Sequence, residues 1–335
     1  MLPAVTTLLL GTLPSTLPPQ EPPTAIVEPT FSEWDVPLQD LDRMAQKYEE
    51  REEARSLLHA ARDAIESDPI FSNKSVTLYY TYEENRSGKN LSGPQLCAND
   101  VCVDNQRFIL AGLPENTETA AQYWNVILQQ GTRVIVSLHD NTEAQEAHAN
   151  FWKQDALDQM RLLDGWTITE KEQEILIAGE PKEVVISTSQ SPETVSPGLI
   201  KTRLLATNGK ETKTLFHLHY VGWPDHSAIS DETVFQALLD QMHILSPKKS
   251  APIAINCHAG IGRTGAAAVT YILERQIEEA VREGKEDLYR VNIPRIVFVF
   301  RQQRPYALPN SGNVPKIFSV LEKYYKRLTK EKAKQ

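Results

Sequence analysis

Apolar positions recur along this chain with two spacings, and each spacing predicts one kind of element. A repeat of three or four residues is typical of amphipathic helices, and short β-branched runs are typical of buried strands. Helices are expected at 117–130, 231–245, 263–282 and 314–328, and strands at 106–111, 132–138, 214–221 and 251–256. Because strands alternate with helices, with shorter strands expected in the middle of the chain, the pattern indicates an α/β domain with a mixed sheet.

The first part of the chain has a different pattern. Residues 1–37 are rich in proline, which removes backbone donors and fixes φ, so an extended, unpacked and disordered leader is expected there. Apolar residues at helical spacing follow in 38–68, with Asp35 or Asp40 as candidate caps. We expect this N-terminal extension to form a helix that packs on the main domain, residues 70–330. A free helix that binds a partner is the alternative.

Composition excludes several classes of protein. The chain has 335 residues, 41% of them apolar and 24% charged, which is typical of a soluble globular protein with a real core. No apolar run approaches the roughly 20 residues of a membrane span. The net charge of −9 argues against general nucleic-acid binding. Three cysteines are too few for a disulfide scaffold, and no basic residue precedes Arg43, which argues against a secretory signal.

The segment around Cys257 carries the clearest chemical signal. An apolar strand leads into Cys257, a loop with Gly260 and Gly262 follows, and an alanine-rich helix begins at Arg263. Glycines allow successive N–H groups to form an anion nest, and a helix start adds its dipole and free donors. The planar fork of Arg263 can hold two oxygens of a phosphate. A cysteine in such positive surroundings favours the thiolate and is a nucleophile.

The spacing between the cysteine and the arginine is weak evidence when taken alone. A cysteine followed six positions later by arginine arises by chance about once in twenty per cysteine, from average residue usage. Of the three cysteines only Cys257 has this spacing. The glycines, the preceding strand and the following helix strengthen the interpretation, because the chemistry requires each of them.

Residues Asn256–Gly265 resemble the signature of the protein tyrosine phosphatases, His-Cys-Ser-Ala-Gly-Ile/Val-Gly-Arg-Thr/Ser-Gly, at eight of ten positions. Residues 217–226 resemble the mobile loop of that family, whose Trp-Pro-Asp supplies a general acid. Residues 108–117 and 300–305 resemble its Gln-Gly-Pro segment and the approach to its glutamine loop. The resemblance covers about 70–328 and implies a phosphatase-like fold, a central mixed twisted sheet flanked by helices. The long spacing between motifs favours the tyrosine-specific branch.

The resemblance implies a two-step mechanism without a metal or other cofactor. Cys257 would attack phosphorus to form a cysteinyl-phosphate, while Arg263 and the loop amides hold the equatorial oxygens. Asp225 would protonate the leaving phenol and then activate water. Burial under a closed loop would keep its carboxyl protonated for the first of these steps. Thr264 would hydrogen-bond the sulfur, and Trp223 would anchor the loop hinge. The residues expected to contact the substrate are His258, Ala259, Gly260, Ile261, Gly262 and Trp223.

Metal binding is not indicated by the histidines. None of them has a convincing ligand spacing, and His217 and His219 alternate along a strand, so they are interpreted as facing opposite sides.

The chain departs from the family pattern at several positions. Asn256 replaces the histidine before the cysteine, and His258 replaces serine; the simplest interpretation of His258 is a side chain that faces solvent. Ser87 stands where the family has a tyrosine that stacks on the substrate. The two glutamines of the glutamine loop fall on Pro309 and Asn313. Three alternatives follow for the glutamines: Gln302 or Gln303 compensates, Asn313 acts instead, or the second step is slow.

Asp155 and Asp158 are candidates to orient Arg263, with a solvated helix face as the simpler interpretation.

These observations favour a phosphotyrosine-protein phosphatase that acts on phosphotyrosine-containing proteins. A phosphoinositide phosphatase is the first alternative, although the cysteine loop lacks the lysines such enzymes often use. A module that traps phosphotyrosine without turnover is the second. A cytoplasmic site of action is expected, because neither a membrane span nor a convincing signal is present. The proline-rich leader and helix before the domain also resemble the layout of bacterial effectors injected into host cells.

Overall fold

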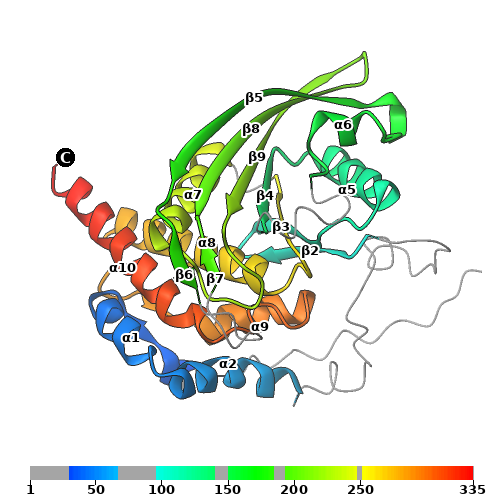
Figure 1. Cartoon of the computed structure of the whole chain (residues 1–335). Coiled ribbons are helices and arrows are strands. Elements are labelled where there is room, and N and C mark those ends of the chain that lie inside the picture. The colour runs from blue at the N-terminus through cyan, green and yellow to red at the C-terminus, as the bar shows by residue number, and fades with distance from the viewer. Residues whose placement is uncertain (1–29, 67–95, 140–149, 185–192, 247–250, 335) are drawn as a thin grey trace, which may run out of the picture. The chain divides into compact units, whose positions relative to one another are not determined.

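A seven-stranded sheet organises the chain, in the order β2-β3-β10-β4-β9-β8-β5 (Figure 1). Its strands are β2 (Ala98–Val103), β3 (Gln106–Gly112), β4 (Val134–Leu138), β5 (Thr167–Ala178), β8 (Gly198–Thr207), β9 (Thr212–Val221) and β10 (Ile253–Cys257). Two small sheets pair β1 (Val36–Pro37) with β11 (Arg290–Val291) and β6 (Lys182–Val184) with β7 (Glu193–Val195). The computed structural model describes residues 30–66, 96–139, 150–184, 193–246 and 251–334.

Helices cover both faces of the sheet. Helices α5 and α6 lie on one face, and α7, α8, α9 and α10 lie on the other (Figure 1). The helices are α1 (Leu41–Lys47), α2 (Arg51–Glu66), α5 (Thr117–Gln130), α6 (Gln154–Leu157), α7 (Glu232–Leu245), α8 (Gly262–Glu283), α9 (Ile293–Gln303) and α10 (Asn313–Lys332). Along β10, Ile253 and Ile255 enter the core beneath α8, whereas Ala254 enters the core beneath α5. This alternation is the reason β10 is apolar throughout.

The middle of the sheet determines where the chemistry can occur. Strand β10 pairs in parallel with β3 on one side and with β4 on the other, and β4 pairs in parallel with β9. The carboxyl ends of four neighbouring strands therefore meet at one edge of the sheet. In open α/β sheets this edge is where ligands bind. Here it carries the loop that follows Cys257 and the loop that follows Val221.

The mixed α/β sheet predicted from the pattern is confirmed. Each of the eight predicted helices and strands is present, with bounds that differ by only a few residues. The prediction of shorter strands in the middle of the chain is wrong for β5 and β8, which have 12 and 10 residues. Most of β5 is exposed at the edge of the sheet, so charged residues obscure its alternation. Strand β2 and helix α9 were not predicted either.

The prediction of an unpacked leader is wrong for its last residues. Phe31 and Val36 are buried, and β1 pairs with β11. The side chain of Asn292 donates to the Phe31 carbonyl at 2.7 Å and to the Asp35 carboxylate at 2.8 Å. Apolar residues between the prolines account for this packing, since burial of each apolar side chain offsets part of the conformational entropy lost when the segment is ordered. Residues 1–29 lie outside the described residues.

The predicted helix over 38–68 is two helices. The chain turns between α1 and α2 at Tyr48, whose ring is buried and stacks on Phe318 of α10 at 5.3 Å. Asp40 precedes α1, but its side chain makes no capping bond and instead pairs with Arg43. Both helices pack on the helices that cover the sheet, as predicted. The domain boundaries at 38–68 and 70–330 stay a prediction.

Candidate active site

Two loops meet at the carboxyl edge of the sheet. The cysteine loop (residues 257–263) joins β10 to α8, and the aspartate loop (residues 222–230) joins β9 to α7. Nη2 of Arg263 lies 3.0 Å from Oδ1 of Asp225, and its Nη1 donates to the carbonyl of Trp223 at 2.8 Å. The Arg263 side chain is 2% exposed, while one third of the Asp225 side chain is exposed. The structure thus brings together the predicted arginine and the predicted general acid.

The cysteine loop is held from behind through its carbonyl oxygens. The carbonyl of His258 accepts from the N–H of Leu113 at 2.9 Å, and that of Ile261 accepts from the N–H of Leu308 at 3.2 Å. In a planar trans peptide the N–H of the next residue points opposite to the carbonyl. Each of these carbonyls therefore directs the N–H of the following residue away from the group that binds the carbonyl.

Arg304 completes this support, a role that no motif in the sequence predicts. Its Nη2 donates to the carbonyl of Ala259 at 2.9 Å and its Nε to the carbonyl of Gly260 at 3.1 Å. Nη1 is bound to Oδ1 of Asn99 at 2.6 Å, so the buried guanidinium is fixed. The amides of residues 259–262 consequently form a row of donors, which is the geometry of an anion nest.

Gly260 is required by the approach of two backbones. Its φ is +67°, and a Cβ atom there would lie 2.3 Å from the backbone of Ala111. Only glycine allows the loop to turn at this distance from β3. The signal was visible in the sequence as a loop glycine, and the structure supplies its reason.

The remaining predicted residues differ in how they are placed. His258 is exposed, which agrees with its interpretation as a side chain that faces solvent. The Trp223 ring is fully buried against Tyr220 and Phe235, as a loop anchor requires, and its contact with substrate stays a prediction. The Thr264 hydroxyl is buried and has no hydrogen-bond partner among the described residues. Its bond to the sulfur therefore stays a prediction as well. Ser87 lies outside the described residues.

Asn256 belongs to a buried polar chain beneath the nucleophile. Its Oδ1 accepts from the hydroxyl of Ser137 at 3.0 Å and from that of Tyr123 at 3.4 Å. Ser137 is in turn bound to Nε2 of His217 at 2.8 Å. Burial raises the pKa of Tyr123, so its hydroxyl stays a donor. Asn256, which stands where the family has a histidine, is thus held by two hydrogen bonds that its amide oxygen accepts.

The interpretation of His217 and His219 as facing opposite sides is wrong. Residues two apart on a strand share a face, and both rings pack on Trp152, at 4.0 and 5.0 Å between centroids. His139 joins them, 4.5 Å from His219. The three histidines are buried, yet among the described residues no group of histidines, cysteines and carboxylates could hold a metal ion.

The three histidines should make the fold sensitive to acid. Burial lowers the pKa of His219 to about 4 and that of His139 and His217 well below the ordinary value. Neighbouring histidines and the charge of Arg263 lower that of His139 further. The unfolded chain then binds more protons than the folded one between about pH 6.5 and 4. The free energy of unfolding should fall as pH falls through this window, by up to about 1.4 kcal/mol per pH unit for each histidine.

Replacing His139 with phenylalanine tests this expectation. Neither ring nitrogen of His139 has a partner among the described residues, so His139→Phe keeps an aromatic ring and removes a titrating group. The variant should lose less stability than the wild type between pH 7 and 4, measured by urea unfolding. Equal slopes for the two proteins would contradict the assignment.

Two asparagines hold the aspartate loop in place. Oδ1 of Asn313, at the start of α10, accepts from the N–H of Ile229 at 2.9 Å. Nδ2 of Asn310 donates to the carbonyl of His226 at 3.1 Å. His226 has a φ of +57°, a strained backbone for a residue with a side chain. The segment that resembles the glutamine loop is therefore bound to the aspartate loop, and Asn313 stands where the family pattern has a glutamine.

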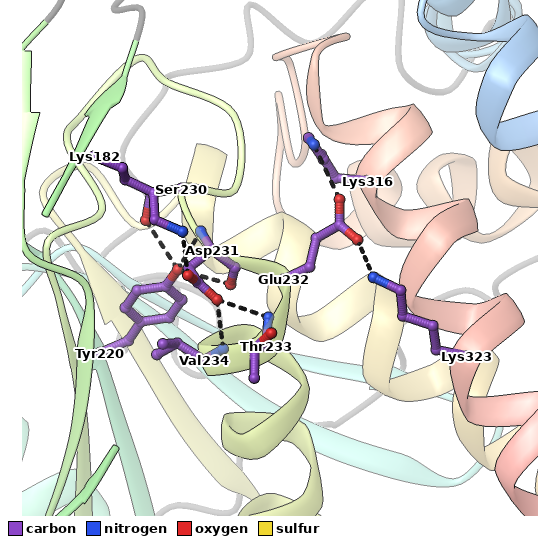
Figure 2. Close-up of polar contacts among 9 residues, drawn as sticks. All are labelled: Lys182, Tyr220, Ser230, Asp231, Glu232, Thr233, Val234, Lys316 and Lys323. Carbon is purple, nitrogen blue, oxygen red and sulfur yellow. Dashed lines mark hydrogen bonds and ion pairs between the residues drawn. The ribbon is translucent and has the colours of Figure 1, made fainter. Parts of the chain in front are cut away.

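The base of the aspartate loop is closed by a polar cluster (Figure 2). The Tyr220 hydroxyl is bound to Ser230 at 2.9 Å and donates to the carbonyl of Asp231 at 3.0 Å, so both ends of the loop are joined. The Asp231 side chain caps α7 and pairs with Lys182 of β6. Burial acts to raise the pKa of Asp231, but Lys182 and the helix amides keep it below its ordinary value. Glu232 holds the other side, through Lys316 and Lys323 of α10.

Two of the proposed substitutes for the family glutamines are already engaged. The side chain of Gln303 exchanges hydrogen bonds with the backbone of Cys102, at 2.8 and 3.0 Å. The amide oxygen of Asn313 is bound to the aspartate loop. Gln302 stays a prediction. Asp155 of α6 and Asp158, which follows α6, are exposed, and among the described residues Asp225 is paired with Arg263. The solvated helix face was the better interpretation for these two residues.

Removing the Asn313 side chain should weaken closure of the aspartate loop. In Asn313→Ala the Ile229 N–H loses its acceptor in a buried position, a cost of about 1–3 kcal/mol that favours an open, hydrated loop. We expect kcat for an aryl phosphate to fall roughly tenfold, the equivalent of about 1.4 kcal/mol. Asn313→Asp keeps an acceptor oxygen and should retain most of the rate. Unchanged kcat in the alanine variant, with only a lower melting temperature, would contradict this role.

The sequence of the chain matches one protein family. The family described as protein-tyrosine phosphatase matches residues 96–314. The chain is 25% identical over 227 residues to the tyrosine-protein phosphatase corkscrew of Drosophila melanogaster, which is 66% of the chain and 24% of that protein. It is 27% identical over 188 residues to receptor-type tyrosine-protein phosphatase C of Rattus norvegicus, 55% of the chain and 13% of that protein.

A third relative extends the range of source organisms. Tyrosine-protein phosphatase 2 of Dictyostelium discoideum is 25% identical over 227 residues, which is 67% of the chain and 54% of that protein. The chain thus spans at most about half the length of these three relatives. The family match includes the cysteine loop, the aspartate loop and all seven strands of the main sheet. The chain belongs to the protein-tyrosine phosphatase family.

Proposed function

We propose that this chain hydrolyses phosphotyrosine in proteins through a cysteinyl-phosphate intermediate. The observation that carries the proposal is the contact between Asp225 and Arg263, the residue that ends the cysteine loop. Cys257 ends β10, Arg263 opens α8, and Asp225 reaches Arg263 from the aspartate loop.

The first step transfers the phosphoryl group to sulfur. The Cys257 thiolate attacks phosphorus, the bond from phosphorus to the phenolic oxygen breaks, and Asp225 gives that oxygen a proton. Arg263 and the amides of 259–262 hold the three equatorial oxygens while charge is redistributed over them. Because Asp225 and an incoming phosphate would compete for one guanidinium nitrogen, binding should release the Asp225 carboxylate toward the leaving group.

The second step returns the enzyme to its starting state. Asp225 takes a proton from water, whose oxygen attacks phosphorus as the bond between phosphorus and sulfur breaks. The buried hydroxyl of Thr264, in the first turn of α8, would donate to the departing sulfur. The side chains of Gln303 and Asn313 already make other hydrogen bonds, and this supports a second step that is slower than the first. None of these steps requires a metal or an organic cofactor.

Two other functions are tested by the same assay. A phosphoinositide phosphatase would prefer inositol lipids, and the uncharged side chains of Ala259 and Ile261 in the cysteine loop count against it. A trapping module would bind phosphotyrosine peptides without releasing phosphate. Release of inorganic phosphate from a panel of phosphotyrosine peptides, an aryl phosphate and inositol lipids separates the three. Phosphate release from phosphotyrosine peptides at the highest kcat/KM is the expected result.

We propose that the chain acts in the cytoplasm. Within the described part of the chain, no helix combines the length and apolarity needed to cross a bilayer. Action on cytoplasmic phosphotyrosine proteins is proposed from the family alone. The relatives reported above come from animals and an amoeba, so they give no support to the effector layout considered from the sequence.

A further inference from the structure

The chain beside the cysteine loop has a strained backbone. Tyr306 and Leu308 have φ values of +63° and +53°, although both carry side chains. Such residues cost on the order of 1–3 kcal/mol each and persist only where their surroundings fix them. The segment that contains them, residues 305–309, therefore depends on contacts made by other parts of the molecule.

This strained segment lies directly against the cysteine loop. The Leu308 N–H donates to the Ile261 carbonyl at 3.2 Å. A Cβ atom on Gly265, in the first turn of α8, would lie 2.4 Å from the Leu308 nitrogen. Ala307 and Leu308 are both fully buried. A shift of the segment would therefore move the carbonyl that orients the amide of Gly262.

Arg301 of α9 fixes the strained segment. Its Nε donates to the Ala307 carbonyl at 3.0 Å and its Nη2 to the Leu308 carbonyl at 3.1 Å. The third arm, Nη1, donates to the carbonyl of Leu58 in α2 at 3.0 Å. Burial and the nearby charge of Arg62 lower the pKa of Arg301 to about 10, so the guanidinium stays charged at neutral pH. A planar fork suits this task, since its donors are preorganised toward separate acceptors.

The N-terminal residues hold α9 at both of its ends. Leu57, Leu58 and Ala61 of α2 are buried in the core that α9 shares. Helix α2 packs on α9 (Figure 1). At the start of α9, Asn292 is bound to Phe31 and Asp35. The match to the phosphatase family begins only at residue 96. Helix α2, which lies outside that match, is thus linked through the Arg301 side chain to the residues behind the cysteine loop.

We infer that residues 31–66 are a working part of the catalytic unit, in which α2 acts through Arg301 to position residues 307 and 308 behind the cysteine loop. Arg301 is a positioning residue, and the N-terminal helices are its support. This inference rests on the proposed function, because it assigns the segment to shaping the same oxyanion site.

Substitution of Arg301 tests the inference at the site itself. Arg301→Met removes all three hydrogen bonds, Arg301→Lys keeps the charge, and Arg295→Met changes an exposed arginine on the same helix. Tungstate affinity, kcat and KM for an aryl phosphate, and melting temperature are measured at 20 °C. We expect Arg301→Met to weaken tungstate binding and to lower kcat/KM roughly 3- to 30-fold. The lysine variant should recover part of both, and Arg295→Met should stay within about twofold of wild type, as surface changes usually do.

The outcomes separate the inference from the proposed function. Wild-type protein that binds tungstate without turnover would refute the proposed function, and the inference would then be judged on tungstate affinity alone. Tungstate affinity and kcat/KM of Arg301→Met equal to wild type, with only a lower melting temperature, would overturn the inference. That result would make Arg301 a stabilising residue and nothing more.

A second variant leaves the arginine in place. Leu58→Ala loosens the packing of α2 and should make a peptide covering residues 304–313 exchange amide hydrogen roughly threefold faster or more. A peptide from the edge strand β5 (Thr167–Ala178) serves as the internal control and should not change. Faster exchange in both peptides, or in neither, would show that α2 does not act on the segment behind the cysteine loop.

Discussion

Replacing Cys257 with serine is expected to abolish turnover of aryl phosphates while leaving oxyanion binding measurable. A serine hydroxyl is far from ionised at neutral pH, so it cannot replace the thiolate as nucleophile. The loss should be at least roughly 10,000-fold in kcat, as for nucleophiles of other covalent enzymes. Binding should survive, because the carbonyls of the cysteine loop are held by Arg304, Leu113 and Leu308, none of which contacts the sulfur in the contacts described.

The exposed Cys102 on β2 offers a matched control. Cys102→Ser makes the same chemical change at a position bound only through its backbone to Gln303. Its kcat should equal that of wild type, and its tungstate affinity should be unchanged. Turnover by Cys257→Ser at a rate similar to wild type would remove Cys257 from the mechanism. Comparable losses in both variants would point to a general effect on the fold.

The sequence located this site because its chemistry is local. The strand, the glycine loop and the helix start that surround Cys257 are consecutive, and each has its own pattern. The aspartate loop was found in the same way, from three adjacent residues that end at Asp225. The parallel pairing of β10 between β3 and β4 then accounts for why the two loops meet.

The supports of the site were missed because they are not local. Arg304 is 44 positions from the Gly260 carbonyl that it binds, and Arg301 is 243 positions from Leu58. No periodicity or motif links such partners, and arginine is more often exposed than buried. The useful signal for Asn313 was the departure itself, an asparagine where the family pattern has a glutamine. The error over His217 and His219 had a different origin, a misjudged strand period rather than a missing signal.

Replacing Asp225 with alanine is expected to separate catalysis from binding. Without a general acid the phenol of phosphotyrosine leaves as an unprotonated anion, and general acids typically contribute about 100- to 10,000-fold. The loss in kcat should therefore be large for a phosphotyrosine peptide and much smaller for an activated aryl phosphate, whose leaving group is stable as an anion. Both values are measured by steady-state phosphate release from the two substrates with the same protein preparation.

The same variant should hold its substrates well. Asp225 lies 3.0 Å from Arg263, so its removal takes away a group that competes with phosphate for the guanidinium. Phosphopeptide affinity should be equal to or tighter than that of wild type. Asp158→Ala, at the exposed residue that follows α6, is the matched control and should change neither rate nor affinity. If Trp223–Asp225 were only a structural turn, both substrates would lose rate alike and the melting temperature would fall. That outcome would remove Asp225 from the mechanism and favour a protein that binds phosphotyrosine without turnover.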